Sequence, residues 1–197
     1  SNPTTAVRER ARATLMEFGS DAIPALRTAT QSNSPRLIGR AIWILAQLGD
    51  EEIVRGFLRS TEARLQVVAV RALAQAAGGK LSLPDLKTLR QFTRHPLMQR
   101  EYALQLAGRD GDESFDLLFD LAETMRGGDR TLLEALGIAA EGRESRLFLE
   151  LDAAFGDSPL GWSGRMATIA WRLHPPESVP GFTQRALSPR LSADAVS

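Results

Sequence analysis

Small and apolar residues recur along the chain in one frame with a period near 31 residues. The first three copies have an Ala, then a pair that ends in Leu, then a small closing residue, as in Ala41, Leu45 and Gly49, and the next two copies keep the central pair. The closing positions fall at residues 19, 49, 77, 108, 140 and 174, and the last copy keeps only its apolar character. A period of this length is typical of helical repeats.

Start and stop signals divide each period into two helices. In the second copy, Ser34 and Pro35 have the residue types of an N-cap and a first helical position, and Gly49 ends the apolar helical spacing. Asp50 is then expected to cap a shorter second helix. Similar signals predict helix starts at three further places, Ser82, Asp112 and Ser158 with Pro159. No stretch alternates cleanly with a period of two, so we expect almost no strand.

These patterns predict an all-α fold of about six two-helix repeats, stacked as a right-handed α-solenoid. Small residues allow the two helices of a unit to approach closely, while the recurring Leu fills the groove to the next unit. We expect a single domain over residues 1–197, and a fragment excised from a larger protein, because both ends look cut. The expected repeats cover residues 7–33, 34–61, 62–94, 95–127, 128–157 and 158–190.

The string from Arg40 to Asp50, with its spaced Ala and Leu and its Gly-Asp ending, resembles the short bacterial HEAT-like repeats, including those named after phycobilisome lyases. The resemblance covers essentially the whole chain, most strongly residues 7–110, and implies the fold rather than an activity. Residues 172–180 are also similar to the HEAT-like region that follows the propeller in large planctomycete-type proteins described as dehydrogenases. That likeness implies a spacer or docking domain.

The sequence offers no convincing site for catalysis or metal binding. His95 and His174 both precede Pro and lack further ligands at metal-binding spacing, so we expect helix-boundary residues. The acidic run 110–116 has Phe115 where a calcium loop needs Gly and lacks its Glu, so its carboxylates are expected to favour a helix start. Nucleophile-elbow and phosphate-loop motifs are missing as well. We therefore predict a protein that is not an enzyme, with no catalytic residue, cofactor or metal.

Composition excludes little beyond a membrane span. No apolar run approaches the roughly 18 residues that a spanning helix needs. Hydrophobic residues make up 43% and charged residues 24% of the chain, which is ordinary for a globular protein. Cys is absent, which removes disulfides but leaves the compartment unknown.

Charges cancel over the whole chain but not along it. The 24 basic and 24 acidic residues give a net charge of +0, yet residues 1–100 hold 15 basic and 8 acidic residues and residues 101–197 hold 9 and 16. Of the basic residues 22 are Arg, which suits bidentate contact with carboxylates or phosphates. A solvated face with ion pairs inside the repeats explains the same residues, and an anionic partner at the basic half is the competing interpretation.

Aromatic residues add one more candidate contact. Trp43 and Trp171 follow apolar residues on expected helices and are predicted to pack in the core or between repeats. Trp162 lies between Gly161 and Ser163 and is the Trp expected to be exposed, which is typical of a contact surface. The candidate interaction surface therefore comprises Arg36, Arg40, Arg64, Arg71, Arg100 and Trp162.

Two classes of function fit these observations. The first is a non-enzymatic interaction or scaffold module that docks a protein, either another domain of its parent chain or a separate acidic partner, on a curved helical surface. The alternative is a HEAT-like nucleic-acid-binding or DNA-repair protein that uses the Arg-rich N-terminal half, as the alkylpurine glycosylases use a basic face. The acidic C-terminal half disfavours nucleic acid. Apolar end faces would also permit weak self-association.

Overall fold

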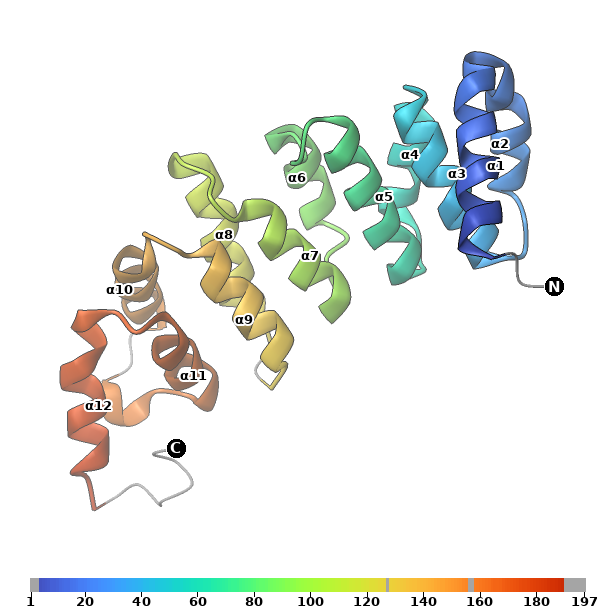
Figure 1. Ribbon diagram of the computed structural model, residues 1–197. Coiled ribbons are helices and arrows are strands. Elements are labelled where there is room, and N and C mark those ends of the chain that lie inside the picture. Colours follow the sequence, from blue (N-terminus) through green and yellow to red (C-terminus); the bar gives the residue numbers. More distant parts are fainter. Residues whose placement is uncertain (1–3, 127, 156–157, 190–197) are drawn as a thin grey trace. The chain divides into compact units, whose positions relative to one another are not determined.

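The computed structural model describes residues 4–126, 128–155 and 158–189, and within these ranges the chain is helical with no strand (Figure 1). The all-α prediction is confirmed. By its internal packing the chain divides into two compact units, Ser1–Met98 and Gln99–Ser197. No helix of the described ranges combines the length and the hydropathy that crossing a membrane requires.

The first unit consists of helices in successive pairs. Helix α3 packs against both α2 and α5, and α4 packs against α5. A 3-10 turn, Gly19–Ala22, joins the first two helices. The pairs are α1 (Thr5–Phe18) with α2 (Ile23–Ala29), α3 (Pro35–Gln47) with α4 (Glu51–Gly56), and α5 (Ala63–Ala76) with α6 (Leu83–Arg90).

The core of the first unit lies between α3 and α5. Leu45 and Leu73, the recurring Leu of two successive repeats, are 0% and 3% exposed. Gly39 faces Val68 across the two helices, and a methyl group added at Gly39 would lie 3.8 Å from the Val68 side chain. This is an ordinary van der Waals distance, so the packing of α3 on α5 leaves room for a methyl group at this position.

The second unit also consists of helices that pack on one another. Helix α8 packs against α9 and α10, and α11 packs against both α9 and α10. Helix α7 (Pro96–Leu106) begins at the end of the first unit and continues into the second. The other helices are α8 (Asp112–Thr124), α9 (Arg130–Ala139), α10 (Glu144–Phe155), α11 (Gly164–Leu173) and α12 (Val179–Ala186), with 3-10 turns at Pro159–Gly161 and Pro176–Ser178. Each expected repeat range contains two of these α-helices.

Several helix starts agree with the cap signals and two differ. Ser34 and Ser82 each accept a hydrogen bond from the backbone three residues on, at 3.5 and 3.2 Å. Asp50 occupies the N-cap position of α4, but its side chain makes no capping bond because it accepts from Arg27 instead. Ser158 opens only the short 3-10 turn, and α11 begins later, where Ser163 accepts from Met166 N–H at 3.2 Å.

Candidate interaction surface

Four of the predicted Arg residues lie on two neighbouring helices of the first unit. Arg36 and Arg40 are one helical turn apart on α3, and Arg64 and Arg71 are two turns apart on α5. These spacings put each pair on one face of its helix. All four side chains are exposed, and α3 and α5 pack directly against each other. We call these four residues the arginine face.

Three members of the arginine face have no charge partner among the residues that the structure describes. Arg36, Arg40 and Arg64 form no hydrogen bond or ion pair with any residue in the part of the chain that the structure describes. An exposed guanidinium that lacks a carboxylate keeps its five donors available to another molecule.

Arg residues on the second helices of the same unit are paired. Arg27 at the end of α2 donates from Nε and Nη2 to the two Asp50 oxygens at 2.7 and 2.9 Å. Arg55 in α4 donates to Asp85 in α6 at 3.1 and 3.3 Å and also pairs with Glu51. The Arg27–Asp50 and Arg55–Asp85 contacts each join one repeat to the next, whereas the Arg55–Glu51 pair lies within α4. Ion pairs inside the repeats, the competing interpretation, occur at Arg12 with Glu9 and Arg55 with Glu51, and none of these pairs uses Arg36, Arg40 or Arg64.

The Asp50 carboxylate is the most enclosed member of these pairs. It is 6% exposed, against 51% for the Arg27 side chain. The hydrogen bond from Arg27 lowers the pKa of Asp50 below its ordinary value of 3.8, and the opposing effect of burial is smaller. Asp50 is therefore charged near neutral pH.

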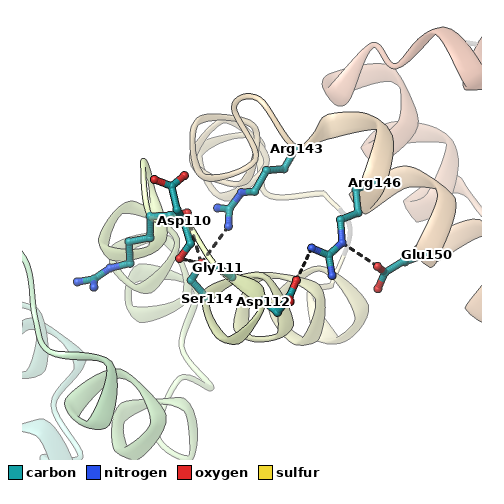
Figure 2. A network of polar contacts seen from close by, with 8 residues as sticks. Asp110, Gly111, Asp112, Ser114, Arg143, Arg146 and Glu150 are labelled. Carbon is teal, nitrogen blue, oxygen red and sulfur yellow. Dashed lines mark hydrogen bonds and ion pairs between the residues drawn. The ribbon is translucent and has the colours of Figure 1, made fainter.

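The second unit has its own polar network between α8 and α10, shown in Figure 2. Arg146 of α10 donates from Nη1 to Asp112 of α8 at 2.7 Å and from Nε to Glu150 at 3.0 Å. Its guanidinium also lies 3.7 Å from the centre of the Phe115 ring. The acidic run predicted to favour a helix start thus places Asp112 at the first position of α8, where Arg146 binds it.

A buried hydroxyl lies beside that network. Ser114 is fully buried and its hydroxyl is within hydrogen-bonding distance of the backbone oxygens of residues 109, 110 and 111, at 2.9 Å for Gly111. Its oxygen accepts from Arg143 Nη1 at 3.1 Å (Figure 2), while Arg143 Nη2 donates to the Ala139 carbonyl. Burial lowers the pKa of Arg143. These contacts hold the start of α8 against the segment before α10.

Arg100 does not belong with the arginine face. It lies on the part of α7 that falls in the second unit and is half-buried. Its charge contributes to lowering the pKa of Asp129, although the hydrogen bonds from Thr131 and Leu132 N–H contribute more. The predicted arginines that lie on packed helices of one unit are therefore Arg36, Arg40, Arg64 and Arg71.

The expectation that Trp162 is exposed is wrong. Trp162 is 6% exposed, its Nε1 donates to Asp152 at 2.9 Å, and its ring packs edge-on against Phe148 and Phe182 at 5.8 and 5.5 Å. Gly181 lies directly against the ring. Trp162 is therefore a core residue of the second unit and offers nothing to a partner.

Trp171, expected to pack in the core or between repeats, is exposed instead. It is 66% exposed on α11 and contacts the His174 and Phe182 rings at 5.3 and 6.0 Å. Together with Pro175 and Val179 these side chains line a shallow hollow of about 320 Å³. The immediate neighbours in the sequence suggested the opposite burial for these two residues, because Phe148 and Phe182, which pack on Trp162, are distant in the sequence.

A larger groove in the first unit was not predicted. It has a volume of about 610 Å³ and is lined by residues of α1, α2 and α3, with Gln75 of α5 at its edge. Trp43, which the sequence places in the core or between repeats, is half-buried and lines this groove. Arg40 of the arginine face lines it too. The alternating Arg and apolar residues of α1 carried a signal for it, but only the packing shows the cavity.

The two histidines lie at helix boundaries, as predicted. His95 Nδ1 accepts from Leu97 N–H at 3.1 Å at the start of α7. His174 ends α11 in a left-handed conformation, with φ of 52°. Within the described ranges no group of three His, Asp or Glu side chains is placed to hold a metal ion.

Comparison with known proteins gives no relative: no family model, no curated protein and no solved structure matches the chain.

Proposed function

We propose that this chain is a non-enzymatic docking module of the HEAT-like type, whose repeats stack as a right-handed α-solenoid and whose arginine face binds an acidic protein. Packing between helices two apart, such as α3 on α5 and α9 on α11 within their own units, supports the stacked repeats. Inter-repeat bonds support it as well, since Arg27 with Asp50 and Arg55 with Asp85 each join consecutive helix pairs.

The observation that carries the docking role is the contrast between two sets of arginines in one unit. Those on α2 and α4 are used to hold repeats together, whereas Arg36, Arg40 and Arg64 on α3 and α5 face outward and lack partners among the described residues. The first unit, residues 1–98, carries 14 basic and 8 acidic residues. A partner with carboxylates at matching spacing would be attracted and held by bidentate bonds.

Charge reversal with a matched control tests this role. We would measure binding of fluorescein-labelled polyglutamate by anisotropy at low and moderate salt. The variant Arg36→Glu/Arg40→Glu/Arg64→Glu should bind at least about tenfold more weakly. The control, Arg94→Glu/Arg126→Glu/Arg130→Glu, changes the net charge equally at exposed positions outside the face. Equal loss in both variants, or no binding by the wild type, would refute the proposal.

Nucleic acid is the second candidate, because arginine also forms bidentate bonds with phosphate. An electrophoretic mobility shift with duplex and single-stranded DNA separates the two. A salt-sensitive shift at micromolar protein that is lost in Arg40→Glu/Arg71→Glu would favour a nucleic-acid function. The absence of a shift at low salt would eliminate it.

The acidic partner is either another domain of a parent chain or a separate protein. Purified chain can be tested for binding to each segment that flanks it in the parent. Retention of one acidic segment, abolished by the charge reversal above, would assign the partner to the parent. Failure with every segment would assign it to a separate protein.

A further inference from the structure

We infer that the groove beside the arginine face binds an acidic amphipathic helix of the partner, with the apolar side chains of that helix inserted between α1 and α3. The inference rests on the proposed function and names the kind of segment that the arginine face recognises. It adds a second source of binding energy, apolar contact, to the charge attraction.

The groove has an apolar floor in a first unit that is otherwise well packed. Leu26, Ala41 and Ile44 form buried parts of its lining. Val7 and Leu37 also line it, and they are 56% and 44% exposed. A volume of about 610 Å³ holds several large side chains, and covering such half-exposed apolar surface is favourable.

Cations surround this floor. Arg8, Arg12 and Arg40 line the groove, and Glu9 is the one acidic side chain among the lining residues. Glu9 is 3.7 Å from Arg12, which also donates to Gln47 of α3 at 3.0 Å. Arg40 has no such contact with the described residues, and Arg36 lies one turn before it on α3. The rim therefore favours carboxylates on either side of an apolar anchor.

A helix suits this site better than an extended segment. The walls are helices, whose backbone groups are already bonded, so the groove offers no strand edge to an extended chain. A helix satisfies its own backbone and can present apolar residues at positions i and i+4, with acidic residues beside them. Its apolar stripe would lie in the groove and its carboxylates would reach the arginines.

The groove also has one wall that can adapt to an occupant. Helix α1 contains no buried residue, and Leu15, which faces the groove, is only half-buried. An inserted apolar side chain would cover Val7 and Leu15 of α1 as well as Leu37 of α3. Binding would therefore complete the burial that the chain alone leaves unfinished.

The experiment uses a synthetic helix-forming peptide of about 16 residues with Leu at i, i+4 spacing and Glu elsewhere. One control peptide has every Leu replaced by Ser, and another has every Glu replaced by Lys. Binding to the whole chain is measured by anisotropy and by ¹⁹F NMR of 5-fluorotryptophan. Trp43 lines the groove, while the Trp162 and Trp171 signals, from the second unit, serve as references; Trp43→Phe assigns the signal.

We expect the Leu-Glu peptide to bind, to shift the Trp43 signal alone, and to bind about tenfold more tightly than either control peptide. Val7→Ser/Leu37→Ser should weaken it about tenfold. The matched variant Ile138→Ser/Leu149→Ser changes residues of the second unit that are 47% and 50% exposed and should bind normally.

Different failures identify which proposal is wrong. Equal binding of the Ser-Glu and Leu-Glu peptides, or an unchanged Trp43 signal, would refute the groove as the binding site. The proposed role of the arginine face would still stand. Equal binding of the Lys peptide would overturn the charge matching at the rim. If polyglutamate and the Leu-Glu peptide both fail to bind, both the proposed docking function and the proposed binding site in the groove are refuted.

Discussion

Arg27 donates two hydrogen bonds to Asp50, at 2.7 and 2.9 Å, and so connects the end of α2 to the start of α4. The residue that the cap pattern assigns to a helix start thus serves a contact between repeats. The backbone N–H groups at the start of α4 donate no hydrogen bond to its side chain.

Asp50→Asn should lower the free energy of unfolding near neutral pH, because the charged bond to Arg27 is lost. The pKa of Asp50 is lowered in the folded chain, so its stabilising effect is complete above the ordinary pKa of 3.8 and disappears as the pH falls through the lower folded value. Urea unfolding of both proteins should therefore converge in acid. Glu17→Gln, at an exposed carboxylate of α1, serves as the control. A difference that stays constant with pH would contradict this explanation.

Leu45→Ala should lower the stability of the first unit by about 2–5 kcal/mol, since a fully buried Leu is truncated between α3 and its neighbours. Leu37→Ala changes the same residue type on the same helix at a position that is 44% exposed and should cost less than about 1 kcal/mol. Chemical denaturation followed by circular dichroism measures both. Equal effects would show that the repeat frame is assigned to the wrong residues.

Gly181→Ala should destabilise the second unit by about 1–3 kcal/mol. A methyl group there would lie 2.5 Å from Trp162 Cη2, and the ring cannot retreat because Asp152 and two Phe rings hold it. Gly56→Ala is the counterpart, because a methyl group at that helical position meets no atom within 4 Å. It should raise stability by about 0.5–1 kcal/mol. Thermal melts of the two variants should therefore move in opposite directions.

Trp162→Ala should cost about 3–5 kcal/mol, as truncation of a buried aromatic residue does. Trp171→Ala removes a side chain that is 66% exposed and should cost much less. Acrylamide quenching provides a second readout: the fluorescence of Trp162→Phe should be quenched more completely than that of Trp171→Phe, since the exposed ring remains in the former. The reverse order would mean that the burial of the two rings is exchanged.

The helix pairs could be predicted because their signals are local. Apolar spacing and caps such as Ser34 and Ser82 involve residues within one or two turns of each other. The positions of His95 and His174 followed from the adjacent Pro for the same reason.

Contacts between distant residues could not be read in the same way. Trp162 is buried by Asp152 and Phe182, and no pattern near Gly161 reveals either contact. Asp50 is diverted from its capping role by an arginine 23 residues earlier in the chain. The four arginines of α3 and α5 could be singled out by their spacing. Which arginines were already paired became apparent only from the folded chain.

Helix α1, which has no buried residue, has a consequence for the dynamics of the first unit. Its amide protons should exchange with solvent through detachment of that helix alone, at a lower free energy than unfolding of the α3 and α5 core requires. A helix seated in the groove would bind only the attached form and would slow exchange in α1 in proportion to its occupancy. Helix α1 would thus be the part of the unit least protected from hydrogen exchange in the free chain, and it would become protected when a partner binds.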